Sequence, residues 1–289
     1  MKVDFHMHTT HSDGSYTPTA LIQRCAEKGL GCVSVTDHDT LSGLVECGQE
    51  ARKNGMELVP GVEISAQFEP GTLHILGYFL DPDDSELKEE LGGVQRARKE
   101  RNPQIIEKLR GLGIEISLEE VHKEAALDEE LADRQIGRPH FARVLVKKGY
   151  AASLEDAFGR YLSKGRPAYM DKRRLSSARA IQVIRKAGGI ASVAHPKQMR
   201  LEERELEKEL ARLVGEGLEA IEVYNSCQTA AEHSIYQRLA KHFGLVVTGG
   251  SDFHGASKPG VEVGILGENV SLGYEMVDAL REKLAARRG

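Results

Sequence analysis

Short apolar segments alternate with longer amphipathic ones over most of the chain. Apolar residues recur with a period of two at 2–8, and apolar runs follow at 32–36, 58–64 and 73–79, so we expect four strands there. Helical patterns separate the first three strands. The first helix begins at Thr17-Pro18, a typical N-cap followed by a first-turn proline, and the second spans 41–53. Strands and helices in regular alternation predict a parallel α/β architecture.

The third and fourth strands are joined differently. The link contains the turn signal Glu69-Pro70-Gly71 and is too short for the crossover helix that parallel neighbours need. We therefore expect the fourth strand to run antiparallel or to begin irregularly, and any barrel built from these strands to be imperfect.

Residues 85–169 interrupt the alternation. Helical patterns occupy 86–91, 94–112, 118–124, 139–148 and 154–162, with almost no strand signal. The segment lacks the Gly, Ser and Pro of a linker, so we predict an inserted helical cap. Helices at 176–187, 201–214, 230–243 and 272–286 then alternate with strands at 190–196, 220–225 and from 245. The expected organisation is a seven-stranded barrel divided into 1–84 and 170–289, with the cap at 85–169.

Composition narrows the class of protein. The 289 residues are 40% apolar and 29% charged, as in globular domains that bury a core. The lack of tryptophan and an aromatic content of 5% argue against a stacking platform for single-stranded nucleic acid. No apolar run is long enough to span a membrane, and no signal sequence is recognisable. The four cysteines form no C-x-x-C pair, which favours reduced thiols in a cytoplasmic protein.

Charge is unevenly distributed along the chain. Between Arg134 and Arg179 there are twelve Lys and Arg residues and three acids, so this segment carries +9 and the remainder −14. This distribution indicates that the acidic part of the chain binds metal and that the basic segment binds anions. The alternative is a solvated helical surface that happens to be basic.

Side chains that bind metals recur near the ends of the expected strands. His6 and His8 are two positions apart on the first strand and therefore point the same way. The others are Asp13, His38, Glu63, His74, His195, Asp252 and His254. In an α/β barrel the C-terminal strand ends form one functional rim. His6-x-His8 alone could belong to a solvated tail, but the whole set indicates a shared site.

Nine nitrogen and oxygen ligands are too many for one ion and suit two or three divalent ions. Because the set contains no thiolate and much imidazole, we expect Mn²⁺ first, then Zn²⁺ or Fe²⁺, with Mg²⁺ as a further alternative. Such clusters hydrolyse phosphate esters, because they lower the pKa of a bridging water and hold the attacking and leaving oxygens in line.

Six short motifs follow one another in a specific order. They are His6-x-His8 with Ser12-Asp13-Gly14, Thr36-Asp37-His38-Asp39, Gly61-Val62-Glu63, the lone His74, Ala194-His195-Pro196 and Ser251-Asp252-x-His254. Together they resemble the polymerase and histidinol phosphatase (PHP) family. The resemblance implies a distorted (β/α)₇ barrel, similar to a TIM barrel, with a trinuclear metal site.

The resemblance also implies three ligand sets. They are His6, His8, Glu63 and Asp252 for the first metal, Glu63, His74 and His195 for the second, and Asp13, His38 and His254 for the third. His6, His8, Glu63, His195 and Asp252 would then serve catalysis through the hydroxide that the metals activate.

Asp13 distinguishes branches of this family, some of which have histidine there. The aspartate form resembles the ribonuclease AM-like branch, whose members remove the 3′-phosphate from nucleoside 3′,5′-bisphosphates and trim short RNA from 5′ to 3′. The helical insertion and the segments 137–143 and 161–169 also resemble that branch.

The resemblance gives the basic insertion a role, because arginine makes bidentate bonds with phosphate oxygens. We expect Arg138 to bind the phosphate that is not hydrolysed, assisted by Lys164 and Arg166. His140 is expected to contact a phosphate or to protonate the leaving oxygen. For all four, surface charge without function is the alternative. His11 and Asp39 lie beside expected ligands and would support them.

Three functions remain open on the sequence. The first is a phosphatase for a nucleotide with two phosphates or for the end of an oligoribonucleotide, which Asp13 and the insertion favour. The second is a small-molecule phosphatase of the histidinol phosphate type. The third is a non-catalytic metal- or nucleotide-binding module, against which the complete ligand set argues. We expect no membrane partner and no stable nucleic-acid complex, and the sequence gives no oligomeric state.

Overall fold

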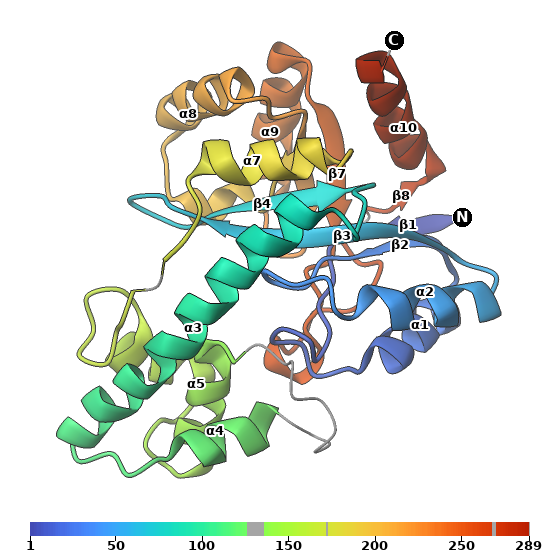
Figure 1. The fold of residues 1–289 in the computed structure, drawn as a ribbon. Coiled ribbons are helices and arrows are strands. Elements are labelled where there is room, and N and C mark those ends of the chain that lie inside the picture. Colours follow the sequence, from blue (N-terminus) through green and yellow to red (C-terminus); the bar gives the residue numbers. More distant parts are fainter. Residues whose placement is uncertain (126–135, 172, 268–269, 289) are drawn as a thin grey trace.

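Seven strands form a nearly closed barrel in the computed structural model, which describes residues 1–125, 136–171, 173–267 and 270–288 (Figure 1). They are β1 (Lys2–Asp4), β2 (Leu30–Val35), β3 (Glu57–Ala66), β4 (Leu73–Tyr78), β5 (Ile190–Val193), β6 (Ala220–Asn225) and β7 (Val246–Gly250). The sheet order is β7-β6-β5-β4-β3-β2-β1-β8, where the short β8 (Leu272–Gly273) pairs antiparallel with β1. The predicted distorted barrel is confirmed, with β8 as an addition to the seven expected strands.

The chain segment after β1 closes the barrel against β7. Phe5 N–H donates to Gly249 O (3.3 Å), and Met7 pairs in parallel with Phe253. A Cβ at Gly250 would lie 2.3 Å from the Cβ of His6, so only glycine allows this close approach.

Strand β4 runs against both of its neighbours. It is antiparallel to β3 and to β5, whereas the other neighbouring pairs among the seven barrel strands are parallel. The antiparallel direction of β4 is one of the two outcomes expected from the short link between β3 and β4. His74, near the start of β4, pairs with Ser65 near the end of β3. The reversal thus places the beginning of β4 at the rim where the parallel strands end.

Helices flank the barrel on two opposite sides. They are α1 (Pro18–Glu27), α2 (Leu44–Lys53), α7 (Ser177–Lys186), α8 (Glu203–Gly215), α9 (Ala230–Phe243) and α10 (Tyr274–Arg288), with short 3₁₀ turns η2 (Pro196–Met199) and η3 (Gly255–Ser257). Figure 1 shows α1 and α2 on one side and α7 to α10 on the other. Thr17 caps α1 as expected, accepting a hydrogen bond from Ala20 N (3.2 Å). Helix α2 begins three residues later than expected, because Thr40 and Ser42 form a hydrogen-bonded turn before it.

The segment between β4 and α7 is helical. It contains α3 (Ser85–Gly111), α4 (Leu118–Ala125), α5 (Arg138–Lys147), α6 (Leu154–Ala157) and the π-helical turn η1 (Phe158–Leu162). One continuous α3 replaces the two helices expected at 86–91 and 94–112. Its first half shares a hydrophobic cluster with the barrel, where Leu87 and Leu91 join Ile181 of α7. In its second half, Ile105 joins a separate cluster with Phe141. Helix α3 therefore connects two hydrophobic cores. Figure 1 shows it running from the barrel to α4 and α5.

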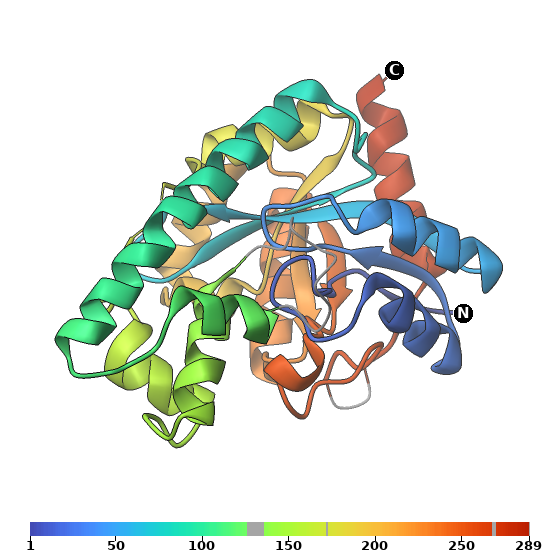
Figure 2. The same ribbon diagram turned by 60° about the horizontal axis from the view of Figure 1, so that its bottom comes forward.

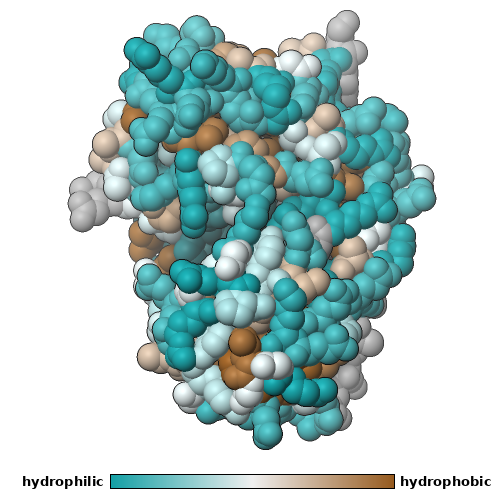
Figure 3. Space-filling model, turned by 90° about the vertical axis from the view of Figure 1, so that its left-hand side faces the viewer, coloured by the Kyte–Doolittle hydropathy of each residue, from teal (hydrophilic) through white to brown (hydrophobic). Residues whose placement is uncertain are grey.

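One face of the molecule, the apolar character of the helices and the state of the cysteines can be compared with the expectations from composition. The face at the left of Figure 1 is mainly hydrophilic, with small, separate hydrophobic areas (Figure 3). None of the helices described is long and apolar enough to cross a bilayer. The four cysteines are free thiols. Arg134 and Lys172, counted in the basic segment, lie outside the described residues.

Candidate metal centre

Nine His, Asp and Glu side chains meet at the C-terminal rim of the barrel. Each of the nine residues expected from the sequence belongs to at least one group whose ligand atoms lie within 4.8 Å of one another. The groups are His8, Asp13, His38 and His254; His6, Glu63 and His195; His6, His8 and Asp252; and His38, Glu63 and His74. The groups overlap, so the rim forms one continuous cluster.

Glu63 lies at the middle of the cluster and is completely buried. Its Oε2 is 3.2 Å from Nε2 of both His6 and His8 and 3.0 Å from Nδ1 of His38. Three imidazoles from the segments after β1 and β2 thus converge on one carboxylate oxygen.

The other oxygen of Glu63 faces a different pair of imidazoles. Oε1 is 2.7 Å from Nδ1 of His74 and 2.9 Å from Nε2 of His195. His195 follows β5, and Ala194 N–H donates to His74 O (3.1 Å), so the two residues are held side by side. A carboxylate with imidazoles on both oxygens has the arrangement of a ligand that bridges two metals.

Asp252 and Asp13 complete the cluster on the side of β7. Asp252 Oδ1 lies 3.5 Å from His6 Nε2 and 3.4 Å from His8 Nε2. Asp13 Oδ1 lies 3.3 Å from Nε2 of His254. Ser15 N–H donates to His254 O (3.1 Å), which joins the loops after β1 and β7 that carry these residues. The two loops, dark blue and orange, can be followed in Figure 2.

The donor set fits divalent metals. Buried atoms that point into the cluster have no hydrogen-bond partner within the described part of the chain: Nε2 of His6 and His8, Nδ1 of His38 and Oε2 of Glu63. Buried polar atoms are normally paired, because an unpaired one costs free energy. Four such atoms facing one another are explained by cations that bind them all.

The electrostatics of the cluster also favour cations. Burial by itself would raise the pKa of the carboxyls of Asp13, Glu63 and Asp252, but the neighbouring imidazoles lower it well below its usual range. Burial works to lower the pKa of His8, yet the adjacent carboxylates of Asp252 and Glu63 raise that pKa to about 10. For His74, burial outweighs the pull of Glu63 and lowers the pKa to about 4. The carboxyl groups of Asp13, Glu63 and Asp252 are therefore ionised, and their negative charges favour the binding of cations in the cluster.

Glu222 supports the cluster and was not expected from the sequence. It is fully buried on β6, and its Oε1 lies 2.9 Å from His6 Nδ1. Its Oε2 accepts hydrogen bonds from His195 N–H (2.6 Å) and Asn225 Nδ2 (3.0 Å). A carboxylate behind a ligating histidine orients the ring. The only signal in the sequence was a lone acid inside the apolar strand Ala220–Asn225.

Asp37 shapes the turn that carries Asp13. It accepts hydrogen bonds from Thr9 N–H (2.7 Å), Thr9 Oγ1 (2.6 Å) and Ser12 Oγ (2.6 Å). The segment after β1 is thereby fixed to the end of β2, and its side chains approach the rim in one arrangement.

Asp39, expected to play a supporting role, connects β2, β3 and the insertion. Its carboxylate accepts hydrogen bonds from Ser65 N–H (2.9 Å) and from Arg98 Nη2 of α3 (2.5 Å). Asp39 has a positive φ of 55°, as have Asp252 (56°) and His195 (24°). Positive φ is uncommon outside glycine, and three of the five described residues that show it have side chains that form or adjoin the cluster; the other two are Phe79 and Arg200.

A pocket of about 380 Å³ opens above the cluster. Seven of the nine expected ligands line it, together with Pro139, Phe158, Gln198, Ser257 and Lys258. Pro139 and Phe158 belong to the insertion, which therefore covers part of the metal centre. Lys258, which the sequence did not single out, donates a hydrogen bond from Nζ to Asp252 Oδ2 (2.7 Å).

A second pocket of about 210 Å³ adjoins the first, because Phe158 lines both. Its wall includes Arg138, Lys164, Tyr169, Arg174 and Arg200. Arg138 stacks on the Tyr169 ring (5.1 Å to its centroid) and donates to Leu162 O (3.0 Å).

The remaining expected substrate residues are placed less centrally. Lys164 forms an ion pair with Glu69. Arg166 is exposed and does not line either pocket. His140 is buried behind Pro139, and its Nδ1 accepts a hydrogen bond from Gly137 N–H (3.0 Å). Burial, helped by the charge of Arg143, lowers the pKa of His140 to about 4, so the ring is neutral at pH 7.

Comparison with known proteins assigns the fold to a family. A family model of the PHP domain matches residues 4–226. The chain belongs to the PHP domain family. Two residues of the metal cluster, Asp252 and His254, lie beyond the matched range, in the C-terminal part of the barrel.

Relatives of this PHP domain are phosphoesterases. A 5′-3′ exoribonuclease of Escherichia coli is 34% identical over 263 residues, covering 90% of this chain and 87% of its own length. A 3′,5′-nucleoside bisphosphate phosphatase of Chromobacterium violaceum is 31% identical over 262 residues, covering 91% and 90%. A Bifidobacterium adolescentis structure classed as a metal-dependent phosphoesterase superposes with a TM-score of 0.86 at 29% identity, covering 97% and 96%. This PHP domain is a metal-dependent phosphoesterase.

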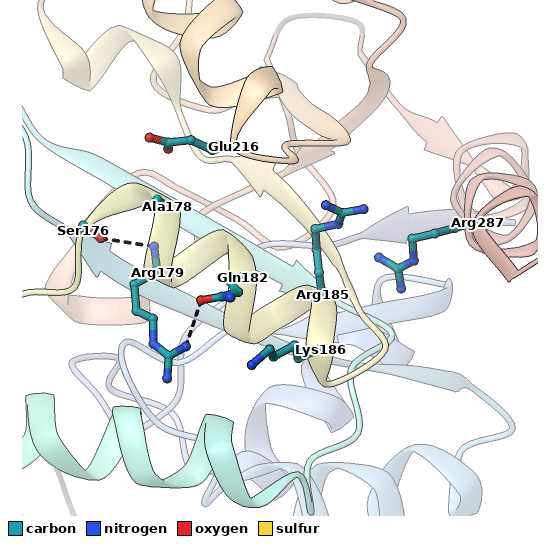
Figure 4. Close-up of a pocket in the computed structure, with 8 residues that line it drawn as sticks. All are labelled: Ser176, Ala178, Arg179, Gln182, Arg185, Lys186, Glu216 and Arg287. Atoms are coloured by element: carbon teal, nitrogen blue, oxygen red, sulfur yellow. Dashed lines mark hydrogen bonds between the residues drawn. The ribbon is translucent and has the colours of Figure 1, made fainter.

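A larger pocket, of about 740 Å³, lies along α7 on the outside of the PHP barrel (Figure 4). None of the nine residues of the metal cluster lines it. The cations of this pocket already have acidic partners: Arg179 pairs with Glu86 and Glu90, and Arg287 with Glu219. Cations that are already paired with surface acids are typical of stabilising contacts and not of a reactive site.

Proposed function

We propose that the protein removes one phosphate from nucleotides that carry a second phosphate, with the 3′-phosphate of nucleoside 3′,5′-bisphosphates as the preferred target. Trimming of short 5′-phosphorylated RNA from 5′ to 3′ would use the same site. The observation that carries the proposal is the pair of adjoining pockets, one above the metal cluster and one basic, which share Phe158.

The reacting phosphate would bind above the cluster. We propose His6, His8, Glu63 and Asp252 for one metal, Glu63, His74 and His195 for a second, and Asp13, His38 and His254 for a third. The distances to the two oxygens of Glu63 support this division. Bound metals would supply Lewis acidity and an activated water, and Mn²⁺ is our first choice because imidazole and carboxylate are mixed and thiolate is absent. The ring of His140 is neutral, and its Nδ1 accepts a hydrogen bond from Gly137 N–H. We propose that its Nε2–H donates a hydrogen bond to a phosphate or to the leaving oxygen of the substrate.

The second phosphate would bind at Arg138. Arg101 of α3 does not line this pocket, but its charge and those of Arg138 and Arg174 in the pocket wall act on one another. Arg101 is 4% exposed, and within the described residues its guanidinium has no carboxylate partner. Its pKa is lowered to about 9, first by burial and then by the charges of Arg98, Arg138 and Arg174. Buried positive charge of this kind is stabilised by a bound anion, and guanidinium suits a phosphate. A substrate with a single phosphate has no need of this pocket, which favours a nucleotide over histidinol phosphate.

We further propose that residues 85–169 act as a cap that completes the substrate site. Helix α3, which joins both hydrophobic cores, and Phe158, which lines both pockets, support this role. The free thiols of the four cysteines favour the reducing cytoplasm as the place of action.

The position of cleavage tests this proposal. Mn²⁺-loaded protein should convert adenosine 3′,5′-bisphosphate to adenosine 5′-phosphate and inorganic phosphate. Chromatography of the products beside standards of adenosine 5′-phosphate and adenosine 3′-phosphate identifies which phosphate was removed. Adenosine 3′-phosphate as the product would overturn the assignment of the two pockets. No reaction with this substrate, together with rapid hydrolysis of histidinol phosphate, would overturn the substrate class.

A further inference from the structure

Lys258 places an ammonium group on the wall of the metal pocket. Within the described part of the chain, it is the only Lys or Arg that lines this pocket. Its side chain is 31% exposed, and its Nζ lies 2.7 Å from Asp252 Oδ2. A surface lysine usually extends into solvent, so a position against a buried carboxylate needs an explanation.

The two oxygens of Asp252 have separate neighbours. Oδ1 faces Nε2 of His6 and His8 (3.5 and 3.4 Å), where we place a metal, and Oδ2 faces Lys258. The ammonium group has three hydrogens, and only the bond to Asp252 is present among the described residues. Two donors therefore remain for an acceptor in the pocket.

The backbone around Lys258 is fixed from two sides. Its own N–H donates to Gly255 O (3.1 Å) at the end of η3. Ser257 Oγ donates to Asp13 O (2.8 Å) and accepts a hydrogen bond from Arg143 of α5. Both the segment after β1 and the insertion thus hold the loop, so the ammonium group is kept near the metal cluster.

We propose that Lys258 is a catalytic residue that binds an oxygen of the phosphate undergoing hydrolysis. Imidazoles that ligate metals are neutral, and the carboxylates of Asp13, Glu63 and Asp252 would be occupied by the metals, so besides those ions Lys258 is the one cationic group that the described pocket wall offers to a dianionic phosphate. A fixed ammonium group offsets charge on the phosphate oxygens, and this stabilisation increases as charge shifts in the transition state. The proposal rests on phosphoester hydrolysis at the metal cluster and not on a nucleotide substrate.

Lys258→Met, Lys258→Gln and Lys258→Arg test the proposal, with Lys28→Met as the matched control. Lys28 also pairs with an acid of the loop after β7, Glu262 (3.1 Å), but lies outside the pocket. The measurements are bound metal per chain, the dissociation constant of inorganic phosphate by calorimetry, and kcat/KM for p-nitrophenyl phosphate.

Lys258→Met and Lys258→Gln should keep their metals, bind phosphate at least tenfold more weakly and lose about 100-fold or more in kcat/KM. Lys258→Arg should recover part of both losses, and Lys28→Met should behave as the unchanged protein. Loss of metal in step with activity would instead make Lys258 a support of Asp252 and overturn the proposal, as would unchanged phosphate affinity. Because p-nitrophenyl phosphate and inorganic phosphate report on the metal pocket alone, a failure of the nucleotide assignment would leave this test intact.

Discussion

Glu63 Oε1 lies 2.7 Å from His74 Nδ1, although the two residues belong to strands that run in opposite directions. In an all-parallel barrel, a residue near the start of a strand would lie at the end opposite the reactive rim. The antiparallel β4 reverses this relationship and delivers an imidazole to the cluster. The irregularity of the barrel is therefore part of the metal centre.

Glu63→Gln tests the bridging position. The amide offers one oxygen and no negative charge, so the two sets of imidazoles would lose their common anionic ligand. We expect fewer bound metals per chain and a loss in kcat/KM greater than the ~10–100-fold that follows from removing a supporting residue. Mass-spectrometric metal analysis of the dialysed variant checks this, and a full metal complement would count against the bridging role.

Glu222→Gln tests the support behind His6. We expect metal affinity to fall about 10–100-fold, because the carboxylate orients His6 and fixes the backbone of His195. Glu219→Gln is the control, since Glu219 precedes the same strand but pairs with Arg287 (3.1 Å), away from the rim. Metal titration should separate the two variants, and equal affinities would show that Glu222 only fills space.

Arg138→Ala tests the basic pocket. We expect KM for adenosine 3′,5′-bisphosphate to rise about 10–100-fold, as for the loss of a charged hydrogen bond of about 1.5–3 kcal/mol. Steady-state kinetics with p-nitrophenyl phosphate should change little, because that substrate has no second phosphate. Arg160→Ala, which removes an exposed arginine stacked on Tyr161 (4.8 Å), is the control. Equal losses on both substrates would place Arg138 in the chemistry or in the fold.

The affinity of the protein for metals should increase as the pH rises. The pKa of His8 is raised to about 10 by the adjacent carboxylates of Asp252 and Glu63, which outweigh burial, so the metal-free ring is protonated at pH 7. That proton must leave before the nitrogen binds a metal. Metal affinity should therefore rise with pH between about 6.5 and 8.5, by up to about tenfold per unit for each proton released. Calorimetry in buffers of different ionisation enthalpy counts the protons, and a pH-independent affinity would contradict this picture.

The sequence predicted the barrel because periodicity, cap signals and link lengths are local properties. His6 and His8 share a face by strand geometry alone, and the short link before Leu73 predicted that the fourth strand would run antiparallel or begin irregularly, of which the structure shows the first. The family resemblance is likewise confirmed by the match of residues 4–226. The continuous α3 was missed, because two adjacent glycines, Gly92 and Gly93, weaken a helical pattern that tertiary packing completes.

The residues that surround the cluster were harder to predict. Glu222 lies inside an apolar strand, and its partners His6 and His195 are distant in sequence. Lys258 is in an irregular loop without periodicity, so no pattern indicates where its side chain points. Arg101 belongs to a highly charged helix, where a buried arginine cannot be distinguished from exposed ones before packing is known.

Comparison of two substrates tests the central claim most directly. The quantity is the ratio of kcat/KM for adenosine 3′,5′-bisphosphate to that for histidinol phosphate, measured with Mn²⁺-loaded protein from which unbound metal has been removed. Two adjoining phosphate pockets predict a ratio well above one that falls toward one in Arg138→Ala. A ratio below one, or a ratio that Arg138→Ala leaves unchanged, would contradict the account.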